Sequence, residues 1–415
     1  MRARSFALLP ATVLVLVACT STTPPPQIGP PPAEDLQAGE FLLVTTDDGI
    51  GVVDASTGEL RFDLVGAVAA PDWSELYRAQ SDGTVTRVER IDPASGEVAS
   101  GTTVDGDLRI QVVSPDGRIA LMPATPDGAW VPRTMTHLAI LDTSSGEMQR
   151  FSIPGNLEPE AFSTDARRLF MLRYQPALAP TSYRVTSLTL RTGRVGAVYG
   201  PGKAATVVEN MTATRVHQAM SPSEDVLFTL YTNQPPDFLV GVEDVDPPHA
   251  LAFIHTLNLE YGTAVCIGLP KSFGTVSTQA SALAASPDGR SVYAIDARHG
   301  VVASMRSRRF KVSEHDVDLS TLGHGPISAS VSTDGATLYL AGSAGVMALD
   351  TETFSPQPLT PTPGSVTGLA LSTDGERLFA SWDGGIGLLD PISLDTVGVL
   401  PSPAPEGAVT FVGAA

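Results

Sequence analysis

The sequence has few of the residues, and none of the local motifs, on which catalysis most often depends. Its 415 residues include two cysteines and three tryptophans. It contains no Gly-x-Ser-x-Gly elbow, no His-Glu-x-x-His pair and no Cys-x-x-Cys-His haem attachment. Residues 200–203 lack the spacing and the following Ser or Thr of a phosphate-binding loop. The chain therefore carries no local signature of an α/β-hydrolase, a zinc peptidase, a covalent haem protein or a P-loop enzyme.

Positive charge is also scarce. The chain has 26 Lys and Arg residues against 45 Asp and Glu residues, a formal net charge of −19. Residues 1–18 contain two arginines and no acidic residue, so the remainder carries −21. A surface this acidic repels phosphate backbones. Nucleic acid is therefore not an expected partner.

Apolar runs long enough to cross a bilayer are missing. A mainly apolar stretch of twelve residues, Phe6 to Val17, follows the basic residues Arg2 and Arg4. Twelve residues are too few to span a membrane, and a basic start followed by a short apolar stretch is typical of a signal peptide. We therefore expect residues 1–18 to be a signal peptide.

What the sequence does contain is a repeat. Seven times, a small residue followed by Pro or Thr, and usually then by Asp, precedes a short apolar run that often ends in an aromatic residue. The seven copies begin at Ala70, Ser114, Ser163, Ser221, Ser286, Ser332 and Ser372. Their first residues are 44, 49, 58, 65, 46 and 40 positions apart. Self-similarity on this scale is the signature of a repeat architecture.

Each repeat contains four short strands. In the last copy the predicted strands are Val366–Leu371, Arg377–Ser381, Gly385–Asp390 and Thr396–Leu400. All are strand-length, rich in branched and apolar residues, and bounded by Gly, Asp, Ser or Pro. Four antiparallel strands make one blade of a β-propeller. The sequence therefore predicts an all-β protein with a single propeller domain over residues 40–415.

The two ends of this domain predict how the ring closes. Residues 41–64 supply a second, third and fourth strand without a first, and residues 408–412 supply a first strand with nothing after it. Joining them completes one blade and removes an open sheet edge. With seven full repeats this gives eight blades; seven is the alternative, if the repeat at Ser163 or Ser221 is absorbed into a neighbour.

The turn between the third and fourth strands recurs as well. Residues 53–59, 91–97 and 141–147 are variants of one motif that ends in Ser-Gly-Glu or Thr-Gly-Glu. With the Ser-Pro-Asp-Gly turn, this pattern resembles bacterial YVTN, TolB-like and WD40-like propeller repeats over roughly residues 41–413. The resemblance implies the fold and says almost nothing about function, because propellers include enzymes, binding proteins and scaffolds.

The residues around Cys19 predict a lipid anchor. Leu16-Val17-Ala18-Cys19 resembles the lipobox of bacterial lipoproteins, in which the peptidase cuts before Cys and the thiol carries diacylglycerol. A plain secretory peptide is the alternative. Residues 19–39 then form a tether with two Pro-Pro-Pro runs, and twenty residues of polyproline II at ~3.1 Å each reach ~60 Å from the lipid. The expected location is the cell membrane, on its extracytoplasmic side.

The connecting segments that are longer than the tight turns of the repeat all lie at one end of the predicted blades. In an up-and-down blade, the turns between strands one and two and between strands three and four share one face, here called the short-turn face. The turns between strands two and three and the links between blades share the other, the long-loop face. The longer segments all belong to the second group: Pro123–Met135, Gln175–Ser182, Gly200–Thr214, Asn233–His249 and Leu269–Ala280. Insertions of this kind commonly mark a binding face.

These segments hold the candidate binding residues. Aromatic, guanidinium and charged groups of the kind enriched at interfaces lie in three of the five. The predicted binding-face residues are Trp130, Arg133, Lys203, Asp237, Phe238, Glu243, Asp244, Asp246 and His249. The plain alternatives are that the aromatic and arginine side chains pack on their own blade and that residues 233–249 are a solvated acidic loop. We expect a protein or a cell-envelope component as the ligand.

Two histidines are candidates for the mouth of the central channel. His217 starts an inner strand and His324 precedes another. A metal site built from these two and His249 has no supporting spacing, so no metal or other cofactor is predicted. A hydrolase or lactonase with a divalent metal at the channel mouth is the alternative function, because ligands from different blades leave no local motif.

Overall fold

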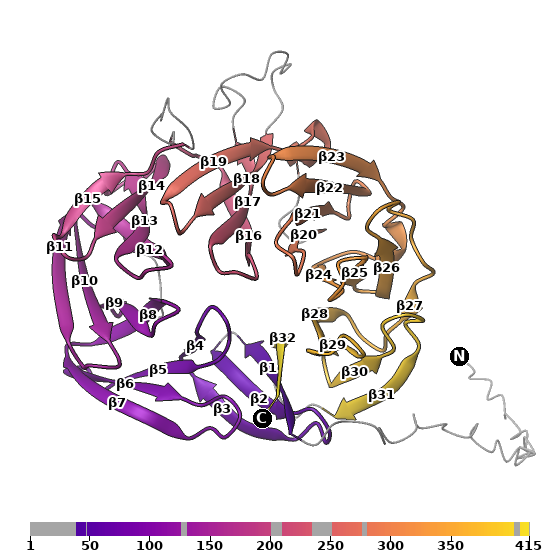
Figure 1. Cartoon of the computed structure of the whole chain (residues 1–415), viewed down its shortest axis with the longest axis horizontal. Coiled ribbons are helices and arrows are strands. Elements are labelled where there is room, and N and C mark those ends of the chain that lie inside the picture. The colour runs from indigo at the N-terminus through magenta and orange to yellow at the C-terminus, as the bar shows by residue number, and fades with distance from the viewer. Residues whose placement is uncertain are drawn as a thin grey trace, which may run out of the picture.

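Eight four-stranded antiparallel sheets form a ring, which is an eight-bladed β-propeller (Figure 1). The computed structural model describes residues 39–46, 48–125, 131–200, 210–234, 251–275, 280–401 and 407–414. The predicted all-β class and the count of eight blades are confirmed. In Figure 1 the first strand of each blade lies nearest the ring axis and the fourth lies at the rim.

The first four complete blades follow the chain order. Each pairs its four strands consecutively, with the first innermost. Their strands are β4 (Ala67–Ala69), β5 (Leu76–Ser81), β6 (Val85–Ile91), β7 (Val98–Asp105), β8 (Leu108–Val113), β9 (Arg118–Pro123), β10 (Met135–Asp142), β11 (Met148–Pro154), β12 (Asn156–Phe162), β13 (Arg168–Gln175), β14 (Ser182–Thr189), β15 (Arg194–Ala197), β16 (Thr214–Met220), β17 (Val226–Gln234), β18 (Leu251–Asn258) and β19 (Thr263–Gly268).

Three further blades continue the same order, and two short 3₁₀ helices lie in the links before them: η3 (Lys271–Thr275) and η5 (Ser320–Leu322). The strands are β20 (Ser281–Ala285), β21 (Ser291–Asp296), β22 (Val301–Arg306), β23 (Lys311–Asp316), β24 (Ser328–Val331), β25 (Thr337–Gly342), β26 (Gly345–Asp350), β27 (Thr360–Pro361), β28 (Val366–Leu371), β29 (Leu378–Trp382), β30 (Gly385–Leu389) and β31 (Thr396–Pro401). The strands predicted for the last repeat are confirmed to within one residue at each end.

The eighth blade joins the two ends of the domain, as predicted. It contains β1 (Glu40–Thr46), β2 (Gly49–Asp54) and β3 (Leu60–Val65), with β32 (Gly407–Ala414) paired antiparallel to β1 as the innermost strand. A buried ion pair joins this blade to its neighbour, with Arg377 Nη2 2.8 Å from Glu40 Oε1. The rings of Trp73 and Phe411 stack 5.8 Å apart on the other side.

The repeated Ser and Asp residues explain the short-turn face. In the blade β20–β23, Ser286 Oγ donates to Asp288 Oδ1 at 2.6 Å and accepts a hydrogen bond from the Ser291 backbone N–H at 2.9 Å. The same pair of contacts recurs at Ser332, where the acceptor carboxylate belongs to Asp334. The serine thus satisfies a backbone donor that the tight turn would otherwise leave unpaired.

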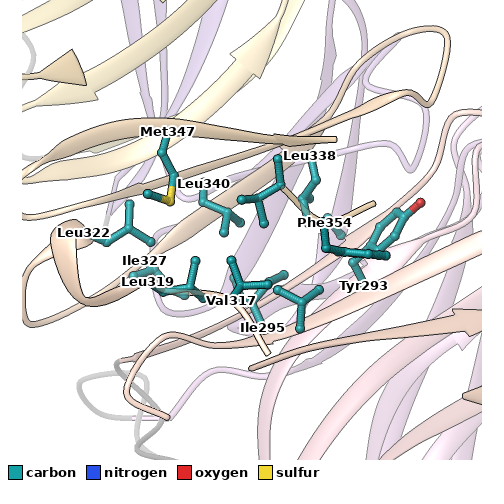
Figure 2. Close-up of a cluster of buried hydrophobic side chains, with 14 of the residues drawn as sticks. Tyr293, Ile295, Val317, Leu319, Leu322, Ile327, Leu338, Leu340, Met347 and Phe354 are labelled. Carbon is teal, nitrogen blue, oxygen red and sulfur yellow. The ribbon is translucent and has the colours of Figure 1, made fainter. Parts of the chain in front are cut away.

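Packing between blades supplies the core. Eight clusters of buried apolar side chains lie among the described residues, each between two adjacent blades. Figure 2 shows the cluster between the blades β20–β23 and β24–β27, where Ile295 and Tyr293 meet Leu338 and Leu340. Successive residues of a strand face opposite neighbours. This is why strands in the middle of a blade, such as β25 and β29, are nearly continuous apolar runs.

Candidate functional site

The long-loop face is as the sequence predicts it in the described part of the chain. Each of the five longer segments connects either strands two and three of one blade or the last strand of one blade to the first strand of the next. The strands that flank them are β9 and β10, β13 and β14, β15 and β16, β17 and β18, and β19 and β20. All five connections therefore leave from the same face of the ring. The face carries loops from four consecutive blades, β8–β11 to β20–β23.

Most of the predicted binding-face residues lie outside the described residues. These are Trp130, Lys203, Asp237, Phe238, Glu243, Asp244, Asp246 and His249. The predicted lipidation site Cys19 also lies outside them. Arg133 is described, and its side chain is 21% exposed. Its guanidinium lies 3.4 Å from Glu158 Oε1 and donates to the Leu157 carbonyl at 3.2 Å, so it braces its loop against the next blade.

The two predicted channel-mouth histidines have different surroundings. His217 lies on the innermost strand β16, and its Nε2 is 3.1 Å from Ser281 Oγ on the innermost strand of the next blade. Burial lowers the pKa of His217, which favours the neutral ring at this blade interface. His324 is exposed in the link before β24, and its backbone N–H donates to Ser343 Oγ at 3.0 Å.

No group of three or more His, Cys, Asp or Glu side chains that could hold a metal ion is found within the described ranges. This finding covers His217 and His324 but not His249, the third histidine of the trio considered above, because His249 is outside those ranges. The described chain also forms no helix with the length and apolar composition that crossing a membrane requires.

A pocket of about 830 Å³ opens on the long-loop face beside His324. One wall is the turn between β21 and β22, and the other is the link from β23 to β24 that contains η5. Val317 and Leu319 line the pocket and also belong to the apolar cluster of Figure 2, so its floor is the top of a rigid interblade core. The polar side chains around it are Arg298, His299, Asp316, Asp318, Ser320 and His324.

A carboxylate and an imidazole are paired in the first wall. Asp296 is fully buried at the end of β21, and its Oδ2 lies 2.6 Å from Nδ1 of His299, which is 38% exposed. Asp296 Oδ1 also accepts the backbone N–H groups of Arg298 and His299 at 3.1 and 3.2 Å. The carboxylate favours the tautomer with the proton on Nδ1, which leaves Nε2 as an acceptor for a ligand.

The second wall is also held in a fixed shape. Ser320 Oγ donates to Asp318 Oδ1 at 2.6 Å, and this hydrogen bond is the main reason that the pKa of Asp318 lies below its usual range. The two walls are joined by the backbone N–H of Val317, which donates to the Gly300 carbonyl at 2.8 Å. The pocket is therefore preformed, with imidazole and carboxylate acceptors above an apolar floor.

The sequence did not reveal Asp296, His299 or Ser320 as site residues. Asp296 and His299 stand in a short turn, and Ser320 stands in a link about twenty residues later. Only the folded chain brings His299, with its partner Asp296, and Ser320 to one pocket. The one local signal is an Asp-x-x-His step directly after the apolar run Val292–Ile295, which departs from the turns of the other blades.

A buried carboxyl group lies closer to the ring axis. Glu160 is on the innermost strand β12; its Oε1 accepts a long hydrogen bond of 3.4 Å from Gln218 Nε2, and its Oε2 has no partner among the described residues. Burial raises the pKa of Glu160 to about 7, against the lowering effect of the positive charge of Arg215.

Comparison with known proteins identifies the fold alone. No model of a known protein family and no curated protein sequence matches this chain. Among solved structures, apo AztD from Citrobacter koseri is similar, with a TM-score of 0.54 and 10% identity over 90% of this chain and 98% of AztD. The dihydro-heme d1 dehydrogenase NirN, in complex with DHE, has a TM-score of 0.52 and 17% identity over 91% of this chain and 78% of NirN.

A third similar structure is dipeptidyl peptidase 4 of Porphyromonas gingivalis, with a TM-score of 0.50 and 12% identity. The match covers 80% of this chain and 53% of the peptidase. Identities this low show a shared propeller architecture and do not transfer a site or an activity.

Proposed function

We propose that this chain is a membrane-anchored, extracytoplasmic propeller lipoprotein that binds a protein or a cell-envelope component on its long-loop face. The observation that carries the proposal is the preformed pocket of about 830 Å³ on the face where the longer segments gather. A concave site with a few convergent polar groups above an apolar floor is the usual form of a ligand site. No cofactor and no nucleic acid are part of this function.

The chemistry of the pocket selects the ligand group that enters it. His299 Nε2 and the carboxylates of Asp316 and Asp318 are acceptors, and the protein as a whole is strongly acidic. A ligand group rich in donors, such as the hydroxyl and amino groups of a sugar or a polyamine, matches them.

A thermal-shift screen tests this assignment. The probes are neutral sugars, amino sugars and polyamines, applied to the wild type and to two variants that each add a large side chain at an exposed serine. Ser320→Trp fills the pocket, and Ser313→Trp is the matched control on the outer strand β23 of the blade β20–β23. Probes that bind the pocket raise the unfolding temperature of the wild type and of S313W but not of S320W. Equal shifts in all three proteins, or no shift with any probe, would contradict the proposal.

Membrane anchoring through Cys19 is the second part of the proposal. The lipobox-like residues 16–19 and the Pro-rich residues 20–39 support it, since a lipid, a spacer and a rigid disc suit a binding protein at a membrane surface. Full-length protein made in a lipoprotein-processing bacterium is expected to partition with membranes and to have an N-terminal peptide whose mass includes the lipid on Cys19. Cys19→Ser should be released in soluble form; an unmodified Cys19 in the wild type would refute the anchor.

The paired Asp296 and His299 favour one alternative, a hydrolase. A buried carboxylate that orients an imidazole is a recurring way to prepare a general base, although the nucleophile or metal that completes such a site is not assigned by the described residues. The test is hydrolysis of aryl esters and lactones by the wild type and by His299→Gln, with and without added divalent metal. Activity that H299Q abolishes would replace the binding function with a catalytic one.

A further inference from the structure

Two arginines face each other on the blade β12–β15, in the centre of the predicted binding face. Arg173 on β13 and Arg184 on β14 are direct partners in the antiparallel register. Side chains of such partners project from the same side of the sheet, with Cβ atoms ~5 Å apart. Both side chains are half-buried. Two guanidinium groups are therefore held side by side where like charges repel each other.

Neither arginine has a partner that offsets this repulsion. Within the described residues, Arg173 and Arg184 form no ion pair and no hydrogen bond, and the Nε atom of each is buried and unpaired. Glu158, an acidic residue on the adjacent strand β12, is already engaged by Arg133 at 3.4 Å and by the Tyr174 hydroxyl at 3.1 Å. Burial and the charge of Arg184 lower the pKa of Arg173. Holding two half-buried positive charges together without a partner costs free energy of folding. The chain leaves them unpaired although it has acidic residues in excess.

A pocket of about 380 Å³ on the long-loop face opens at one member of this pair, Arg173. Arg173 lines it together with Gly155, Tyr174 and Asn210 and the turn between β13 and β14. The turn is braced from below, because the buried Asn156 donates through Nδ2 to the Ala177 carbonyl at 3.0 Å. It is also closed by the backbone N–H of Thr181, which donates to the Gln175 carbonyl at 2.9 Å. The pocket wall is therefore ordered before any ligand arrives.

We propose that Arg173 and Arg184 form a binding site for the phosphate group of a ligand. Each planar guanidinium can donate two parallel hydrogen bonds to an oxyanion. Two adjacent guanidiniums match the charge of a phosphate monoester, which carries between −1.5 and −2 at neutral pH; a single carboxylate would neutralise only one of them. The lack of a partner for either guanidinium among the described residues and the pocket at Arg173 are what such a site requires before binding.

This inference goes beyond the proposed function, because none of these residues lines the 830 Å³ pocket. The two sites lie on blades separated by the blade β16–β19. A phosphate group here could be free phosphate or part of a larger envelope component. The chemistry of recognition is the same for both, and the probes below separate them.

The experiment compares unfolding temperatures in sodium chloride and in a few millimolar inorganic phosphate or glycerol 3-phosphate, at equal ionic strength and pH 7.5. The proteins are the wild type, Arg173→Gln, Arg184→Gln, Arg184→Lys and, as a matched control, Arg194→Gln on the exposed outer strand of the same blade. At ten times the dissociation constant, bound phosphate should raise the unfolding temperature of the wild type and of R194Q by about 2 °C or more. R173Q and R184Q should lose this rise, and R184K should keep part of it.

A second readout needs no ligand. Because R184Q removes a like charge, it should unfold in chloride at the same temperature as the wild type or higher, which shows that it is folded.

A larger shift with glycerol 3-phosphate than with inorganic phosphate would identify an esterified group as the natural ligand, and the reverse would identify free phosphate. The site is disproved if the wild type shows no phosphate-dependent shift, or if R173Q and R184Q retain it in full. Neither result bears on the S320W screen, so this site and the 830 Å³ pocket fail or stand separately.

Discussion

Glu160 is a carboxyl group that folding places in a poorly solvated position near the ring axis. Its native pKa of about 7 exceeds the ordinary value of 4.5. The native state therefore binds more protons than the unfolded chain between these values, and the free energy of unfolding falls as the pH rises from 4.5 to 7. Stability from this group is fully present below pH 4.5 and is lost above pH 7.

Glu160→Gln should remove this dependence, because the amide stays neutral at every pH. We expect the variant to be more stable than the wild type at pH 8, by about 3 kcal/mol, and to match it near pH 4.5. Urea unfolding at both pH values measures the difference. The exposed Glu376→Gln is the control and should follow the wild-type profile. A gain for E160Q that is the same at both pH values would show that the carboxyl group is already neutral or is solvated in the native state.

Gly300 is the residue on which the shape of the 830 Å³ pocket depends. Its φ is +67°, and a Cβ atom there would lie 2.6 Å from the Val317 carbonyl oxygen on the opposite wall. Gly335 has a φ of +77° with nothing near its Cβ position. Both Gly→Ala changes carry the backbone strain of positive φ, but only the first adds a clash.

Gly300→Ala should therefore lower the free energy of unfolding by about 1–3 kcal/mol more than Gly335→Ala. Chemical denaturation of both variants gives the comparison. Equal losses would mean that the two pocket walls separate easily and that the pocket is not preformed.

At the scale of single elements, the serine of each Ser-x-Asp turn determines how two strands are joined. Ser286 is buried and links Asp288 to the backbone N–H of Ser291. The hydrogen bond from Ser286 is the main cause that holds the pKa of Asp288 below its usual range. Ser286→Ala leaves a buried backbone donor unpaired, which should cost about 1–2 kcal/mol. Ser313→Ala, exposed on β23 of the same blade, should cost less than 0.5 kcal/mol, roughly the limit for ordinary surface changes.

Elements were predictable where the pattern is local. The strand Val366–Leu371 and its turn could be read residue by residue, because alternation and Ser-Thr-Asp-Gly specify them without help from the rest of the chain. The outer strand β27 has only two residues, Thr360 and Pro361, since the proline-rich residues 356–363 offer few donors for a ladder. Which face of the ring carries the longer segments could also be predicted, because the order of strands in an up-and-down blade fixes the face from which each turn leaves.

The sites themselves were less predictable, because they depend on distances between blades and on register. Nothing in the sequence aligns Arg173 with Arg184, which are eleven positions apart across a turn of unknown length. Likewise, Asp296 with His299 resembles any polar turn until the link residues 316–325 are packed against it. Arg133 was named as a candidate from its residue type, but its ion pair with Glu158 could not be foreseen.

At the scale of the whole molecule, β32 closes the ring. It pairs with β1, and Val409 and Val412 are buried in the apolar cluster shared with Phe379 of the neighbouring blade. Removing residues 407–415 should leave β1 with an unpaired edge and lower the unfolding temperature or cause aggregation. A synthetic peptide of residues 407–414 should restore the stability of the truncated protein by adding the missing strand. A scrambled peptide should not; a truncated protein as stable as the wild type would show that closure contributes little.

The central claim is that one face of this ring binds the ligand. The most direct measurement places a photo-crosslinking amino acid either at His324, an exposed position at the mouth of the 830 Å³ pocket on the long-loop face, or at Glu352, an exposed position on the short-turn face of the blade β24–β27. The full-length chain carries it in the natural host cell, and mass spectrometry identifies any adduct after illumination. We predict a defined adduct from position 324 and none from position 352. Adducts from position 352 alone, or from neither position, would contradict the assignment of the long-loop face as the binding face.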